Sequence, residues 1–139
     1  MPAAPDKLSI IVFSGDFERV HYALSVAAAA AAVDRPATLF FTMGAIHMLG
    51  HRLDDGRPGW QALPGTAKRD AEFADRGVAT FEELFSACVA LDVKMLVCEM
   101  GLRAVGVTTA DLRQDFSIGE GGIVTFLNDA SADGAMLFI

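Results

Sequence analysis

Short apolar runs along the chain alternate with longer segments in which apolar residues recur every three or four positions. The short runs are rich in β-branched and aromatic residues, which is typical of buried strands. Five strands are predicted, at Leu8–Phe13, Thr38–Thr42, Val93–Cys98, Phe116–Ile118 and Gly134–Ile139. Because helical segments separate the strands, the pattern predicts βαβ units and a parallel sheet.

The longer segments carry the start and stop signals of helices. Asp16–Val33 begins with a capping side chain and continues as an alanine-rich stretch. Thr80–Leu91 begins with a capping box, and its apolar residues fall on one helical face. Thr108–Asp111 is expected to start a short helix. The glycine cluster Gly119–Gly122 is expected to open a last helix that ends near Ala130.

These elements predict a single domain over residues 1–139 with an α/β fold. Helices between strands make a three-layer α/β/α sandwich with a five-stranded, mainly parallel sheet. The alanine run Ala27–Ala32 lets backbones approach closely. It fits a helix packed tightly against its own sheet, a subunit interface, or both.

Residues 51–77 form a long, charged excursion from this pattern. The segment holds five positive and five negative side chains. Lys68–Ala74 is expected to form a helical turn or two. A connection of this length is either a solvated excursion or a lid or docking loop, in which Trp60 would anchor a partner.

Composition and charge exclude several classes of protein. A hydrophobic share of 53% excludes a disordered chain and predicts a homo-oligomer that covers the surplus apolar surface. The net charge of −7 gives no basic face for nucleic acid or for anionic lipid. No nucleic-acid partner and no membrane attachment are therefore expected.

The expected compartment is the cytoplasm. The longest apolar run, Ala23–Val33, is too short for a bilayer span, which needs about 20 residues. The first residues lack the cationic start and apolar stretch of a signal peptide. Cys88 and Cys98 do not form a disulfide framework, so both are expected to be free thiols in a reducing environment.

Candidate chemistry gathers where the predicted strands end. Because parallel strands share one carboxyl edge, ligands and reactive groups collect there. This edge receives Ser14 and Gly15 after the first strand, His47 after the second, and Cys98 with Glu99 after the third.

Cys98 is the principal candidate for a reactive residue. If residues 99–105 form a helix, their free backbone amides point at the sulfur and stabilise a thiolate. Arg103 would support that charge and Glu99 would oppose it. The alternative is a buried, inert cysteine, which is also the interpretation of Cys88 on its helix.

The neighbours of Cys98 match a known spacing. Cys98–Arg103, which includes Met100 and Gly101, fits C-x-x-G-x-R, the spacing of a rhodanese sulfur-carrying loop. The rest of the chain does not otherwise resemble a rhodanese. The supporting site residues are therefore taken as Glu99, Met100, Gly101, Arg103, His47, Ser14 and Gly15.

Metal and phosphate sites are weaker alternatives. His47 and His51 are four residues apart, a spacing that binds metal on a helix, but a firm third ligand is missing. His47 is otherwise a general base near Cys98 or a packing residue. The glycine turns Gly15 and Gly119–Gly122 suit tight turns better than a phosphate cradle. No cofactor and no metal are expected.

Several segments in order along the chain resemble one family. They are Lys7–Asp16, Thr38–Met43, Leu63–Gly65, Phe81–Leu84, Val97–Met100, Val105–Val107 and Gly121–Phe126. Together they resemble the DsrE/DsrF-like family, and in particular its second DsrE branch. The resemblance implies a five-stranded α/β/α domain, often oligomeric, that acts in intracellular sulfur relay.

In such relatives the strand-end cysteine carries sulfane sulfur as a persulfide, and by position this residue is Cys98. The first hypothesis is therefore a cytoplasmic sulfur carrier or sulfurtransferase, whose partners are a persulfide donor and a thiol acceptor protein. A second is a small-ligand or nucleotide-like binding protein that uses the same sheet edge. A third is a non-catalytic subunit of an oligomer.

Overall fold

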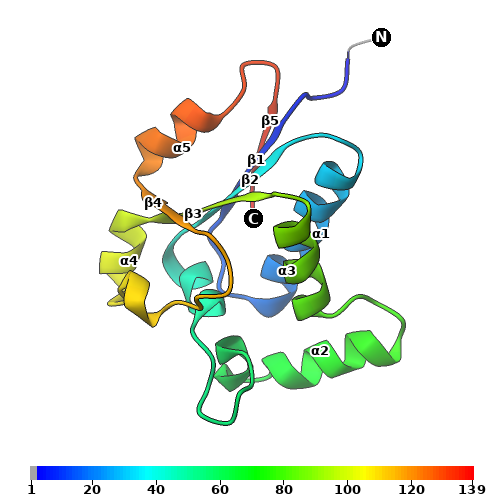
Figure 1. The fold of residues 1–139 in the computed structure, drawn as a ribbon, viewed down its shortest axis with the longest axis vertical. Coiled ribbons are helices and arrows are strands. Elements are labelled where there is room, and N and C mark those ends of the chain that lie inside the picture. Colours follow the sequence, from blue (N-terminus) through cyan, green and yellow to red (C-terminus); the bar gives the residue numbers. More distant parts are fainter. Residues whose placement is uncertain (1–2) are drawn as a thin grey trace.

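The computed structural model describes residues 3–139 as an α/β fold around one sheet (Figure 1). Its strands are β1 Leu8–Val12, β2 Ala37–Phe41, β3 Lys94–Cys98, β4 Gly119–Gly121 and β5 Ala135–Phe138. They lie in the order β4-β3-β2-β1-β5, and every neighbouring pair is parallel. The predicted five-stranded sheet is confirmed and is parallel throughout.

The helices connect these strands. They are α1 Phe17–Ala32, α2 Thr66–Asp75, α3 Phe81–Ala90, α4 Glu99–Val105 and α5 Ile123–Asp129. Short 3-10 helices lie at η1 Met43–Leu49, η2 Gly59–Ala62 and η3 Thr109–Asp111. The predicted caps are present: Asp16 accepts the amide of Arg19, and Thr80 accepts the amide of Glu83.

The two faces of the sheet are covered unequally. In Figure 1, α1 and α3 lie on one side of the strands and α5 lies on the other. Met95 and Val97 of β3 join the large core beneath α1 and α3. Leu96 and Cys98, which alternate with them, join a small cluster on the α5 side. Cys98 therefore belongs to the thinner layer.

The alanine run of α1 packs within its own subunit. Ala23, Ala27 and Ala30 are buried in the large core, and α1 contacts β1, β2 and α3. Their small side chains let the helix lie close to the sheet. Of the two interpretations of this run, the structure supports packing against its own sheet.

The fourth strand lies three residues later than predicted. Phe116–Ile118 is not a strand, because Phe116 packs edge-on against Phe85 of α3 at 5.0 Å between ring centroids. The strand is instead Gly119–Gly121, which pairs with Leu96–Cys98 at the edge of the sheet. These glycines were predicted to open the last helix, which in fact begins at Ile123.

The charged excursion is more ordered than predicted. The helical turns expected at Lys68–Ala74 are a ten-residue helix, α2. The alternative in which Trp60 anchors a partner is not supported, because Trp60 is fully buried. Its ring lies 5.5 Å from that of Phe17 and 4.7 Å from that of Phe81, so it closes the core of its own chain.

Candidate functional site

Cys98 ends β3 and caps α4. Its backbone is extended, and its Sγ accepts a hydrogen bond from the amide of Gly101 at 3.3 Å. The amide contact that the sequence predicts is therefore present. The sulfur is also fully buried, in the cluster with Phe40, Leu96 and Phe126. A reagent reaches it only when this cluster opens.

Gly101 is fixed by close packing. A Cβ atom at this position would lie 2.7 Å from Oγ1 of Thr42 and 2.9 Å from the amide nitrogen of Met43. Such separations are shorter than real Cβ contacts, so a side chain would push α4 away from η1. Because Gly101 has no side chain, α4 packs close to η1 and the Gly101 amide lies within hydrogen-bond distance of the sulfur.

The charged neighbours of Cys98 lie outside its cluster. Glu99, Met100 and Arg103 are exposed. Glu99 and Arg103 line a shallow cavity of about 240 Å³ together with Thr108 and Glu120. Among the described residues no hydrogen bond joins Arg103 to Cys98, so the support expected from its guanidinium is not present in this conformation.

Gly15 and His47 belong to a different cavity. They line a hollow of about 470 Å³ together with Phe17, Glu18 and Arg69, on the α1 side of the sheet. Cys98 is not one of its lining residues. The predicted edge residues therefore divide between the two faces of the sheet, and His47 is not placed as a general base for Cys98.

The glycine turn beside this cavity has a packing role. A Cβ atom on Gly15 would lie 2.9 Å from the carbonyl oxygen of Gly44, so the loops after β1 and β2 touch through their backbones. Ser14 Oγ accepts the amide of Asp16 at 3.1 Å, which tightens the same turn. Close approach of backbone to backbone accounts for the turn without a ligand.

The two histidines do not share a helix. His47 lies in η1, whereas His51 lies beyond it and its Nδ1 is 2.9 Å from the carbonyl oxygen of Arg52. Over residues 3–139 no cluster of three or more His, Cys, Asp or Glu side chains is arranged to hold a metal ion.

Cys88 provides a contrast within the same chain. Its thiol donates to the carbonyl oxygen of Leu24 at 3.4 Å, deep in the core between α1 and α3. Burial raises the pKa of this thiol to about 12, although a backbone hydrogen bond acts in the opposite direction. Cys88 is therefore protonated and unreactive at neutral pH.

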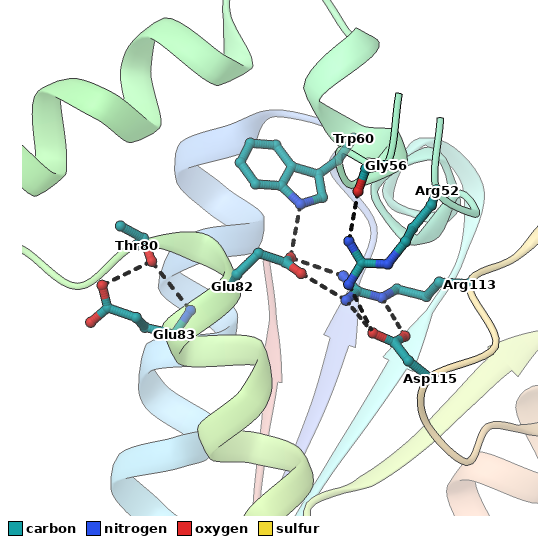
Figure 2. A network of polar contacts seen from close by, with 8 residues as sticks. All are labelled: Arg52, Gly56, Trp60, Thr80, Glu82, Glu83, Arg113 and Asp115. Atoms are coloured by element: carbon teal, nitrogen blue, oxygen red, sulfur yellow. Dashed lines mark hydrogen bonds and ion pairs between the residues drawn. The ribbon is translucent and has the colours of Figure 1, made fainter. Parts of the chain in front are cut away.

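A buried ionic network joins the excursion, α3 and the loop before β4, and no local pattern in the sequence predicts it. Figure 2 shows Arg113 between Glu82 and Asp115, with the indole nitrogen of Trp60 donating to Glu82 at 3.0 Å. The guanidinium of Arg113 is almost fully buried and lies 4.0 Å from the centre of the Phe85 ring.

The charges in this network stabilise one another. Burial opposes ionisation of Glu82, but hydrogen bonds from Arg113 and Trp60 outweigh it and lower the pKa of Glu82. The hydrogen bond from Arg113 likewise lowers the pKa of Asp115. The network ties Trp60 of the excursion, α3 and the loop before β4 into one unit.

Within the part of the chain that the structure describes, no helix is both long and apolar enough to cross a membrane.

Comparison with known proteins supports the resemblance found in the sequence. A search of curated proteins finds no match. Among solved structures, the YchN protein from E. coli matches at a TM-score of 0.61 with 16% identity, over 96% of this chain and 99% of that one. MTH1491 from Methanobacterium thermoautotrophicum, a protein of unknown function, matches at 0.57 with 15% identity, over 96% and 98%. These likenesses establish the fold.

The family follows from a separate comparison. The model of the DsrE/DsrF-like family matches residues 6–132, which include all but the last of the five strands and the whole of the Cys98 region. The chain therefore belongs to the DsrE/DsrF-like family, which is associated with sulfur relay.

Proposed function

We propose that this protein carries sulfane sulfur as a persulfide on Cys98. The observation that carries the proposal is the hydrogen bond from the Gly101 amide to Cys98 Sγ, at the end of the third strand in a chain of a sulfur-relay family. An amide donor stabilises a sulfur anion, whether that anion is a thiolate or a persulfide. Cys88 lies in the main core, where burial raises the pKa of its thiol, so we assign it a packing role.

The proposed reaction has two balanced steps. The Cys98 thiolate attacks the outer sulfur of a donor persulfide, forms a new S–S bond, and releases the donor as a thiolate. An acceptor thiolate then attacks the outer sulfur on Cys98, and the Cys98 thiolate leaves. Each step is thiol exchange, so no external oxidant or reductant is consumed. The cytoplasm, where thiols stay reduced, is the compartment we propose.

Loading is tested by the mass of the intact protein after incubation with a low-molecular-weight persulfide. We expect wild type to gain the mass of one sulfur atom and Cys98→Ser to gain none, with its far-UV circular dichroism unchanged. The matched control Cys88→Ser should still load. It should lose about 1–3 kcal/mol of unfolding free energy, because a hydroxyl replaces the thiol in an apolar site. Loading on Cys88 alone would refute the assignment.

We further propose that the protein is a homo-oligomer that pairs through the exposed apolar side chains of β5, at the edge of the sheet away from α4. Phe138 is 67% exposed there, and its ring lies 5.4 Å from that of the half-exposed Phe13. Met136 shares the face, because β5 pairs with β1 in register and alternate residues point to the same side. A second copy would remove this surface from water.

A further inference from the structure

The burial of Cys98 requires a path by which a reagent reaches it. Four residues make up the cluster around the sulfur, with Ile11 packed against it. Phe40, Leu96 and Cys98 itself are carried by strands of the sheet. Phe126, whose ring lies 5.0 Å from that of Phe40, comes from α5. Movement of α5 therefore uncovers the cluster without breaking any strand pairing.

The helix α5 is anchored at one end. Asp129, its last residue, accepts hydrogen bonds from Lys7 at 2.9 Å, Lys94 at 2.7 Å and Thr38 at 2.6 Å. These partners lie at or next to the starts of β1, β2 and β3, far along the sheet from the carboxyl edge where Cys98 lies. Lys7 also donates to the backbone carbonyl of Asp129. The anchor thus lies at the end of α5 remote from Cys98.

The other end of α5 is weakly held. Gly121 pairs with Cys98, and Gly122 follows it as the link to the helix. The amide of Gly122 donates within the helix itself, to Thr125. Ile123 and Val124, the first two helical residues, are 49% and 69% exposed. Only the burial of Phe126 holds this end against the sheet.

We propose that α5 is a hinged lid over Cys98: its first turns lift from the sheet while the helix pivots at Asp129, which stays bound, and the Gly122 link between β4 and α5 yields to the movement. The lid rests on the proposed function, because it regulates access to the sulfur carrier. Local opening of a short element costs less free energy than global unfolding, so the lid opens in the folded protein. The closed form would shield a loaded persulfide from water and from unselective thiols.

The test is native-state alkylation with iodoacetamide, followed separately at the Cys98 and Cys88 peptides by mass spectrometry. Cys88 lies in the main core and reports global unfolding in the same sample. Because local opening exposes little surface, the Cys98 rate should hardly depend on urea below the unfolding transition. The Cys88 rate should rise steeply. An equally steep rise at both cysteines would overturn the lid.

Two matched substitutions identify the moving element. Phe126→Leu should speed alkylation of Cys98 about five- to tenfold, because it weakens the only buried contact of the lid. Phe85→Leu in α3 is the control. It should speed alkylation of Cys88 and leave Cys98 unchanged, since the open form keeps α3 packed. If Phe126→Leu leaves the Cys98 rate at the wild-type value, α5 is not the lid.

A third substitution tests the hinge. Asp129→Asn should leave the Cys98 rate unchanged. In wild type the contacts of Asp129 are made in both the closed and the open form, so weakening them changes the free energies of both forms equally. An acceleration as large as that of Phe126→Leu would show that the whole helix detaches, and would contradict the hinge. Sulfur loading without these rate effects would refute the lid and leave the proposed function standing. The rate effects without sulfur loading would refute the proposed function and leave the movement of α5 standing.

Discussion

At the scale of single residues, the site depends on a glycine, Gly101, because there is no room for a side chain at this position. Gly101 allows α4 to lie against η1, and its amide then reaches the sulfur of Cys98. We predict that Gly101→Ala costs about 1–3 kcal/mol of unfolding free energy, because the added methyl meets Thr42 and Met43 below normal contact distance. Urea denaturation followed by circular dichroism measures this loss.

A second glycine serves as the control for that substitution. Gly122 has no atom within 4 Å of the place where a Cβ would lie, and its backbone is extended. Gly122→Ala should therefore keep or slightly raise the stability, through reduced freedom of the unfolded chain. Equal losses of unfolding free energy in Gly101→Ala and Gly122→Ala would mean that close packing against η1 does not explain why residue 101 is a glycine.

Asp129 is the residue whose charge matters most for the α5 layer. Burial alone would raise its pKa, but hydrogen bonds from Lys94, Thr38 and Lys7 hold the pKa well below the ordinary 3.8. Because the pKa of Asp129 is lower in the folded state, its ionised carboxylate stabilises the fold. This stabilisation is complete at pH values above the unfolded-state pKa and is lost as the pH falls through the folded-state pKa.

The pH dependence of one variant checks this sign. The loss of stability in Asp129→Asn should be largest near pH 7 and should shrink as the pH falls below 3.8. Urea unfolding of wild type and variant across a pH series gives the two curves. A difference that grows on acidification would contradict the assignment.

At the scale of elements, the buried Arg113 joins parts of the chain that are distant in sequence. It pairs with Glu82 of α3, which also accepts the indole N–H of Trp60. Arg113→Met should cost about 2–4 kcal/mol of unfolding free energy, because Glu82 is then left half-buried without its cation. Chemical denaturation measures it.

The double variant Glu82→Gln/Arg113→Met separates the charge effect from the packing effect. It should recover part of the loss, since no unpaired charge is then left in the core. A double variant that loses the sum of the two single losses would show that the two side chains act independently.

At the scale of the whole molecule, the exposed apolar side chains of β5 make the monomer an incomplete unit. Light scattering at micromolar concentration should give a mass well above the 14.7 kDa of one chain. Phe138→Glu places a charge on the exposed apolar surface and should lower that mass without loss of circular dichroism. A monomeric wild type would refute the assembly.

The sequence predicts the architecture better than it predicts the site. The strands β1, β2, β3 and β5 are apolar runs, and their helices carry caps, so periodicity finds them. The strand β4 consists of glycine, glutamate and glycine, and its pairing comes from the neighbouring β3 rather than from its own residues. Local patterns therefore misplace it.

The features of the site that the sequence does not predict depend on contacts between segments that are distant along the chain. The position of Cys98 and the Gly101 amide follow from a strand end and a turn, both local features. The burial of Cys98 depends on Phe126, and the order of the excursion depends on Trp60 and Arg113. Each of these contacts needs tertiary packing, which the order of residues does not display.

In the proposed function, sulfur enters and leaves through Cys98. The direct measurement locates the sulfur by tandem mass spectrometry of blocked, digested protein, before and after addition of a thiol acceptor. We predict the extra sulfur on the Cys98 peptide after loading, and its loss to the acceptor with the Cys98 thiol restored. Sulfur on the Cys88 peptide, or a Cys98 peptide that never gains sulfur, would contradict it.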